Sequence, residues 1–375
     1  LFPKTYDDLP TVLAESDLIF ESVAESMDIK KDINAKIAQY APADVIIGTG
    51  TSGLSITSLA ECFEGTQRAQ YTGTHFFNPP NVLRLCEVIP TEYTDKAFLA
   101  EYTKYLTDIM NRAVVVVKDE AGFLGNRIGF QFMNEALQYA EQYKDKGGVG
   151  YIDAIIGPFT GRNMAPIATA DFVGLDVHKA IVDNLYDKTN DYAHETFKLP
   201  GYVQKLIDAG DLGKKAGKGL YQTVVDAEGN KSRNVYDIVS GSLQPAAKYD
   251  LPFAKKMVEA LGEGDVDAAM AALKADTTEE GKLCLTFLLK YILYSVVTAL
   301  EVAETVNDAD TAMATGFGWA PPLGVMEALG GAAEVRSLME KNLDAATLGK
   351  LDLGAIFGRE FKCAFDYKKF FKAKL

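Results

Sequence analysis

Short apolar runs alternate with amphipathic stretches through the first third of the chain. The runs of strand length, each bounded by turn residues, are Asp17–Val23, Asp44–Gly48, Ala69–His75, Leu83–Ile89 and Ala113–Lys118. Between them, the segments with helical spacing are Met27–Tyr40, Ile56–Phe63 and Ala97–Met110. Strands that alternate with helices predict an α/β layer whose sheet is largely parallel.

The pattern becomes helical after Asp119. A long helix is predicted at Gly122–Tyr143. Further helices are expected at Tyr151–Ile156, Asp171–Tyr186, Val203–Ala209, 253–274, 278–304, 308–315, 321–329 and 331–342. A polar stretch with Gly and Ser, roughly 223–250, predicts a linker or extended connection between the two groups of helices.

The helical part contains an internal repeat. One long helix precedes YIDAIIGPFTGRNMAPIATADFVGLD, and a second precedes DADTAMATGFGWAPPLGVMEALGG. Each copy then has a short helix near an Asp, a Gly-rich turn, a Pro and a helix that ends in Gly. Asp153 corresponds to Asp310, and Gly174 to Gly330. Two copies of one module predict an internal pseudo-dimer in which each copy covers the other's apolar face.

Composition narrows the class of protein. The 375 residues carry a net charge of −14, which argues against general nucleic-acid binding, and an anionic ligand needs a local basic patch. The four cysteines are far apart and follow no metal-ligand spacing, so we expect no metal site and a reducing, cytoplasmic location. The apolar run Leu283–Leu300 is interrupted by Lys290, which favours a buried helix over a membrane span.

A histidine and a glutamate form the first candidate for chemistry. His75 ends one predicted strand, and Glu87 lies in the next. Adjoining strands would bring them side by side, and a carboxylate on one ring nitrogen fixes the tautomer and favours the imidazolium that forms when the other nitrogen takes a proton. The alternative is a polar residue at a strand end beside an unrelated Glu.

Three more segments are candidates for a binding site. Ser52 lies in TGTSGL, directly after a strand, where open α/β sheets bind ligands. Asn126 lies in GFLGNR at the start of a helix, and Lys215 lies in the lysine-rich GKKAGKGLY. A Ser/Gly turn, a helix cap and a solvated basic loop explain the same residues without function.

Taken together and in this order, the motifs resemble one family. HFFNPPNVLRLCEVI, TSGLSITSLA, GFLGNR and GKKAGKGLY are similar to signatures of the 3-hydroxyacyl-CoA dehydrogenases of fatty-acid β-oxidation, over residues 5 to about 222. The resemblance implies NAD-dependent oxidation of 3-hydroxyacyl-CoA to 3-ketoacyl-CoA. His75 is then the general base, Glu87 orients it, Ser52 holds the substrate oxygen, and Asn126 positions substrate and His75.

The resemblance also implies a cofactor site and partners. Glu25 and Lys30 would lie near the NAD ribose, and Lys215 would approach the nicotinamide. The later repeat resembles the duplicated helical half of multifunctional members. This implies a monomer built as an internal pseudo-dimer, or else a homodimer like the single-copy members, and a fused or partner enoyl-CoA hydratase.

The chain departs from the family at its start. No G-x-G-x-x-G turn follows a strand, so we expect a truncated Rossmann-type domain that lacks the first β-α-β unit. NAD binding by these residues alone is expected to be weak or absent and the fragment inactive, whereas the parent protein is expected to be active. Gly50 stands where the family has Asn, and GPFTGRNMAP replaces a family turn.

The predicted organisation follows from pattern and resemblance together. The partial Rossmann-type domain spans 1–118, the first all-α copy spans 119–222, the linker spans 223–252 and the second helical copy spans 253–375. Two other functions stay open. One is a non-catalytic binding or structural relative that keeps the fold, and the other is a dehydrogenase that acts on free hydroxy acids.

Overall fold

The computed structural model describes all residues from Leu1 to Leu375, which form two compact units. The first comprises Leu1–Leu124 with Ala299–Gly316, and the second comprises Gly125–Thr298 with Phe317–Leu375. Ala299–Gly316 was predicted within the second helical copy. It joins the first unit because it makes backbone hydrogen bonds to Arg84 and Lys118, which flank strands of the first unit's sheet.

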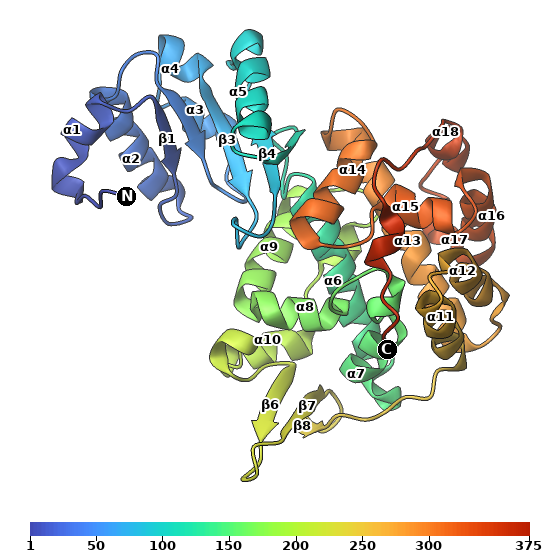
Figure 1. Ribbon diagram of the computed structural model, residues 1–375. Helices are drawn as coiled ribbons and strands as arrows, with labels where there is room; N and C mark the ends of the chain where they lie inside the picture. Colours follow the sequence, from blue (N-terminus) through green and yellow to red (C-terminus); the bar gives the residue numbers. More distant parts are fainter. The chain divides into compact units, whose positions relative to one another are not determined.

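The first unit is built on a five-stranded sheet whose strands lie in chain order (Figure 1). These strands are β1 (Leu18–Glu21), β2 (Ile46–Thr49), β3 (Tyr71–Phe76), β4 (Leu85–Ile89) and β5 (Ala113–Val116). All neighbours are parallel except β3 and β4, which are antiparallel. The predicted α/β layer with a largely parallel sheet is therefore confirmed.

Helices connect and cover these strands. They are α1 (Leu9–Ala14), α2 (Met27–Tyr40), α3 (Ile56–Ala60), α4 (Gly65–Ala69), α5 (Lys96–Asp108) and α14 (Asn307–Ala312), with a 3-10 turn at Tyr6–Asp8. The bounds of α2 are those the sequence predicts. Helix α4 was not predicted, because its five residues, GTQRA, carry no apolar period.

Helix α5 determines which face of the sheet is core. Phe98, Tyr102 and Leu106 of α5 pack on Cys86 and Val88 of β4. Because side chains alternate along a strand, residues 75 and 87 point to the opposite face from Cys86. The sheet thus buries one face under α5 and keeps the other for His75 and Glu87.

The second unit is mainly helical. Its helices are α6 (Gly125–Gln142), α7 (Gly148–Ile155), α8 (Pro166–Val173), α9 (Leu175–Lys188), α10 (Gly201–Asp208), α11 (Pro252–Gly262), α12 (Val266–Ala275), most of α13 (Glu279–Val302), α15 (Pro322–Ala328), α16 (Ala332–Asn342), α17 (Ala345–Leu348) and α18 (Leu353–Phe357). Two predicted helices are each interrupted by a glycine in the left-handed region. Gly174 (φ 107°) separates α8 from α9, and Gly264 (φ 77°) separates α11 from α12.

The prediction of a linker and of an all-α second part is wrong at residues 223–252. This stretch contributes to a small antiparallel sheet made of β6 (Tyr221–Val225), β7 (Lys231–Asp237) and β8 (Ser242–Pro245), whose β6–β7 turn projects from the helices (Figure 1). The strands are largely exposed and polar, so they lack the apolar alternation that identifies a strand in a sequence. Tyr236 anchors them by stacking on Tyr202.

The order of elements repeats within the helical part. Helices α6, α7, α8 and α9 are matched by α13, α14, α15 and α16, and α8 and α15 both begin with a Pro. Phe132 of α6 packs edge-on against Phe287 and Tyr291 of α13, and the Lys290 ammonium pairs with Glu135 at 2.5 Å. The two long helices therefore pack together, while the internal pseudo-dimer stays a prediction.

Helix α13 is long and apolar enough to cross a membrane by length and composition alone. However, 78% of its most apolar window is buried inside the protein, as in a core helix of a folded domain.

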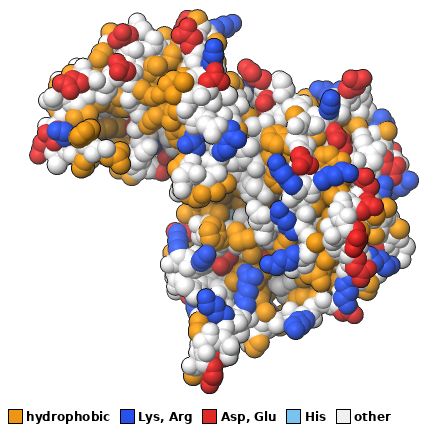
Figure 2. All heavy atoms as spheres, in the orientation of Figure 1, with side chains coloured by type: hydrophobic (Ala, Val, Ile, Leu, Met, Phe, Trp, Pro, Cys, Tyr) orange, Lys and Arg blue, Asp and Glu red, His pale blue; other side chains and the backbone are white.

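Acidic and basic side chains are scattered over both units in the face that Figure 2 shows.

Candidate functional site

The antiparallel pairing of β3 with β4 brings His75 and Glu87 together. The two residues are direct partners in the register, so their side chains project from the same face of the sheet. His75 Nδ1–H donates to Glu87 Oε2 at 2.7 Å, and the Glu87 side chain is fully buried. The carboxylate thus fixes the proton on Nδ1 and leaves Nε2 as an acceptor.

Ser52 occupies the other side of the imidazole ring. Its Oγ lies 3.0 Å from His75 Nε2, in the loop that follows β2. The three side chains form one chain of hydrogen bonds, Ser52 to His75 to Glu87. Such a chain can take a proton from a hydroxyl group held beside Nε2 and stabilise the imidazolium that results.

The segment that follows β5 contacts both the ring and the carboxylate, and Phe77, directly after β3, also contacts the ring. Glu87 Oε1 accepts from the Leu124 backbone N–H at 3.1 Å. The rings of Phe77 and Phe123 contact the imidazole at steep angles, with centroid distances of 4.8 and 5.5 Å. Phe123 adopts a left-handed backbone (φ 50°), which costs a non-glycine residue about 1 kcal/mol or more and persists only where the surroundings require it.

Glu25 organises the loop that carries Ser52. Its Oε1 accepts from Thr51 Oγ1 at 2.6 Å, from Ser52 N–H at 2.9 Å and from Gly53 N–H at 3.1 Å. The structure therefore gives Glu25 a role in shaping the site. Its predicted contact with the cofactor ribose stays a prediction.

Lys30 lies at the carboxyl ends of β1 and β2, but it is buried. Its ammonium donates to both oxygens of Glu21, at 2.9 and 3.0 Å, and to the Val23 carbonyl at 3.3 Å. Glu21 in turn accepts from Thr49 Oγ1 at 2.6 Å. Lys30 thus ties two strand ends together with donors that are all engaged, and its predicted approach to the ribose stays a prediction.

Asp119 holds the start of α3, next to the Ser52 loop, and was not among the predicted site residues. Its carboxylate accepts from the backbone N–H groups of Ile56 and Thr57 at 3.0 and 2.9 Å, and from Ser55 Oγ at 3.0 Å. It therefore caps α3, which begins directly after the Ser52 loop. The available signal was an acidic residue placed immediately after an apolar strand.

The remaining two predicted site residues belong to the second unit. Asn126 lies in the first turn of α6 and is 7% exposed. Lys215 pairs with Asp176 at 2.5 Å, and its hydrogen bond lowers the pKa of the Asp176 carboxyl. Their predicted roles beside substrate and nicotinamide stay predictions.

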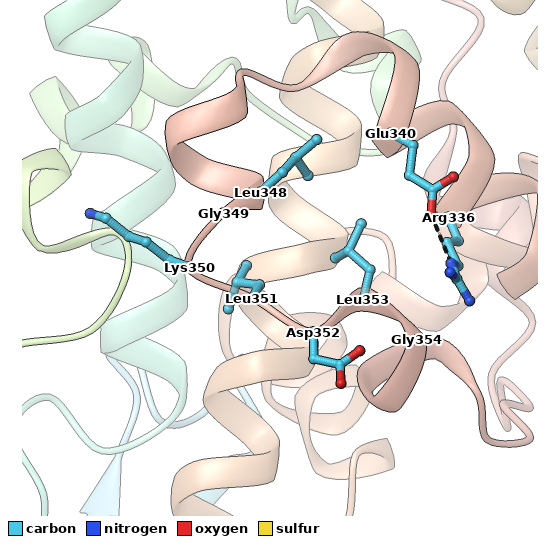
Figure 3. A pocket seen from close by; sticks show the side chains of 9 residues that line it. All are labelled: Arg336, Glu340, Leu348, Gly349, Lys350, Leu351, Asp352, Leu353 and Gly354. Carbon is cyan, nitrogen blue, oxygen red and sulfur yellow. Dashed lines mark hydrogen bonds and ion pairs between the residues drawn. The ribbon is translucent and has the colours of Figure 1, made fainter.

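Charged residues also line a hollow in the second unit. A surface hollow of about 620 Å³ on the second unit is lined by α16, α18 and the turn between α17 and α18, and the Arg336–Glu340 ion pair closes one side of it (Figure 3). Its other charged groups are Lys350 and Asp352. Nowhere in the 375 residues do three or more metal-binding side chains come together.

The carboxyl edge of the sheet lies next to the Ser52 loop. Parallel strands β1 and β2 end at Glu21 and Thr49, and the loops after them carry Gly50 and Ser52. Open α/β sheets bind ligands at this edge. The Gly50 backbone N–H donates to the Glu21 carbonyl at 2.9 Å, and a side chain at this position would bring its Cβ to 3.3 Å from the same oxygen.

Comparison with known proteins gives consistent results. Residues 4–120 match the family described as 3-hydroxyacyl-CoA dehydrogenase, NAD binding domain, and residues 122–223 match its C-terminal domain. The chain is 32% identical over 320 residues to a probable 3-hydroxyacyl-CoA dehydrogenase of Bacillus subtilis; the match covers 84% of the chain but 39% of that protein. It is 34% identical to a 3-hydroxybutyryl-CoA dehydrogenase of Clostridioides difficile, over 58% of the chain and 73% of the relative.

A solved structure shares the fold. The crystal structure of 3-hydroxybutyryl-CoA dehydrogenase from Escherichia coli matches with a TM-score of 0.65 at 20% identity, over 93% of the chain and 79% of that structure. At this identity the match speaks to the fold alone. It extends over both the sheet-containing and the helical part of the chain.

Proposed function

Because the chain belongs to the 3-hydroxyacyl-CoA dehydrogenase family, we propose that it serves in the NAD-dependent oxidation of 3-hydroxyacyl-CoA to 3-ketoacyl-CoA. The observation that carries this proposal is the hydrogen-bonded chain from Ser52 through His75 to Glu87. Oxidation of a secondary alcohol releases a hydride from carbon and a proton from oxygen, so it needs a base at the hydroxyl group.

His75 is the residue placed to take that proton. With Nδ1–H bound to Glu87, Nε2 faces Ser52 Oγ at 3.0 Å and accepts a proton from a hydroxyl held beside it. The buried Glu87 carboxylate then stabilises the imidazolium. Ser52 donates to the same oxygen and keeps it within reach of the ring.

Bound NAD supplies the acceptor for the hydride. The residues that would hold it are those of the loops at the carboxyl edge of the sheet, where Glu25 shapes the turn that carries Ser52. Asn126, Lys30 and Lys215 are proposed to complete the substrate and cofactor contacts. These assignments come from the family resemblance.

The substrate class is tested by NADH formation in the complete gene product. We expect NADH from 3-hydroxybutyryl-CoA or a longer homologue, and little from free 3-hydroxybutyrate. Turnover of the free acid alone would favour the alternative dehydrogenase. No NADH with either substrate would favour a non-catalytic relative. The 375-residue chain is titrated with NADH in parallel, since the sequence predicts weak binding.

The packing of α6 on α13 supports a second part of the proposal, an internal pseudo-dimer that makes the protein monomeric. Light scattering tests it by mass in solution. A mass of one chain supports the internal pairing, whereas a mass of two chains supports the homodimer. A fused or partner enoyl-CoA hydratase stays a prediction.

A further inference from the structure

The first unit holds one segment that is remote from it in the sequence, Ala299–Gly316. We propose that this segment is a strap that sets the geometry of the Ser52–His75–Glu87 chain, with Gly316 and Lys118 as positioning residues. The proposal rests on the function proposed above and adds to it a requirement for the later helical part of the chain.

One end of the strap is fixed to the end of β5. Val117 and Ala303 form an antiparallel bridge, and the Lys118 backbone N–H donates to the Val302 carbonyl at 2.8 Å. The Lys118 ammonium adds a hydrogen bond to the Glu301 carbonyl at 2.6 Å. These contacts determine where the chain leaves the sheet.

The residues that leave the sheet at this point hold all three members of the site. Asp119, next to Lys118, caps the helix that follows the Ser52 loop. Phe123 lies against the His75 ring, and the Leu124 N–H binds Glu87. A shift of Lys118 is therefore transmitted to each of them through a short stretch of chain.

The other end of the strap contacts the loop that joins β3 and β4, the strands that carry His75 and Glu87. The Arg84 backbone N–H donates to the Thr315 carbonyl at 3.1 Å, immediately before β4. Gly316, in the π-helical turn Met313–Phe317, lies so close that an added Cβ would come within 2.5 Å of Leu85 Cδ2 and 3.4 Å of Phe77 Cδ1. Leu85 begins β4, and Phe77 is the ring that contacts His75.

The strap thus touches the site from two directions. Through Val117 and Lys118 it positions the groups that hold Glu87 and the Ser52 loop, and through Gly316 it positions the ends of β3 and β4. π-helical turns often occur at functional sites, since they insert an extra residue where packing demands it. A bulkier residue at 316 would displace Leu85 and Phe77 and misalign the His75–Glu87 pair.

The first test measures kcat and KM for Gly316→Ala in the complete gene product. Misplacement of a reacting group by about 1 Å can cost on the order of 100-fold, so we expect kcat to fall by tenfold or more while KM for NAD changes less than twofold. The matched control is Gly201→Ala, because an added Cβ there meets no atom within 4 Å. Activity equal to that of the control would overturn the proposal.

A double variant separates positioning from loss of stability. Leu85→Val removes the atom that Gly316→Ala would strike. If crowding causes the loss, the pair Gly316→Ala and Leu85→Val regains most of the lost kcat. If the two changes merely add their costs in stability, the pair is less active than either alone, and the proposal fails. Lys118→Met tests the other end if Gly316→Ala does not fold.

A spectroscopic readout works whether or not the protein turns over substrate. The chain has three histidines, so the ring nitrogens of His75 can be assigned by NMR. We expect the Nδ1–H tautomer in the wild type and a mixture in Gly316→Ala, with His178 and His194 unchanged. If the tautomer changes in Gly316→Ala but the wild type transfers no hydride, the proposed function is wrong and the role of the strap stands. If the wild type transfers hydride but the tautomer is the same in Gly316→Ala, the proposed role of the strap is wrong.

Discussion

Replacement of Glu87 by Gln is a sharp perturbation because it changes chemistry with little change in shape. The carboxylate accepts from His75 Nδ1–H at 2.7 Å through one oxygen and from Leu124 N–H at 3.1 Å through the other. An amide offers one acceptor oxygen and one donor nitrogen, so one of these bonds must be lost. If the amide nitrogen faces His75, it donates to Nδ1, and the ring proton moves to Nε2, where it blocks acceptance of a proton from substrate.

The size of the effect follows from the bonds that change. A hydrogen bond to a charged group contributes about 1.5–3 kcal/mol, and about 1.4 kcal/mol corresponds to a factor of ten in rate. Loss of the carboxylate alone therefore lowers kcat by about 10- to 150-fold. If the wrong tautomer also forms, the contribution of the general base disappears and the loss reaches about 100- to 10,000-fold. The Glu87 side chain is fully buried, so water does not compensate.

The assay combines steady-state kinetics with NMR of the His75 ring. Glu87→Gln is expected to lower kcat in this range and to move the ring proton toward Nε2, with KM for NAD nearly unchanged. Glu92→Gln, an exposed change beyond the end of β4, is the matched control. If Glu87→Gln keeps kcat within twofold of the wild type, or if Glu92→Gln causes the same loss, Glu87 does not hold the His75 tautomer.

Three further predictions concern the loop and the second unit. Glu25→Ala removes the acceptor of three hydrogen bonds in the Ser52 loop, so kcat should fall several-fold and urea denaturation should show a loss of about 1–2 kcal/mol; unchanged values for both would contradict the role of Glu25. Burial lowers the pKa of His178 from 6.5 to about 3. Between pH 6.5 and 3 the imidazole is therefore protonated in the unfolded state but not in the folded state. The free energy of unfolding should fall by up to about 1.4 kcal/mol for each pH unit as the pH drops through this range. His178→Gln should remove this dependence of the free energy of unfolding on pH, measured by urea denaturation between pH 4.5 and 7. Burial raises the pKa of Asp153 to about 6, which gives a pH dependence of the opposite sign. Because Asp153 is present in both proteins, its contribution cancels when the variant is subtracted from the wild type. The Arg162 guanidinium lies 4.1 Å from the Phe132 ring centroid and donates to Thr160, and burial lowers the pKa of Arg162 to about 10. In urea denaturation, Arg162→Met should therefore leave the free energy of unfolding unchanged or raise it, whereas Arg162→Ala should lower it by about 2 kcal/mol or more. Equal losses in both variants would show that the charge stabilises the fold.

The sheet and the central pair were predictable because they depend on local pattern. Each strand is a short apolar run, and the antiparallel register that pairs 75 with 87 follows from two adjacent strands with a short connection. The family motifs then identified Ser52, which the structure places beside His75. These features needed no knowledge of distant contacts.

The parts that were missed depend on contacts that leave no periodic signal. Asp119 caps a helix that lies more than 60 residues earlier in the chain, and Leu124 contributes a backbone N–H, which any residue could supply. The polar strands β6–β8 bury few side chains, so their sequence is that of a loop. Lys118 and Glu301 are 183 residues apart, and only the fold brings them together.

His75 is proposed to take the proton of the substrate hydroxyl group. The most direct measurement is kcat for NADH formation from 3-hydroxybutyryl-CoA by His75→Gln in the complete gene product, with His194→Gln as the matched control. We expect kcat to fall by about 100- to 10,000-fold for His75→Gln, with KM for NAD within twofold of the wild type and no loss in the control. If His75→Gln keeps kcat within twofold of the wild type, His75 is not the base.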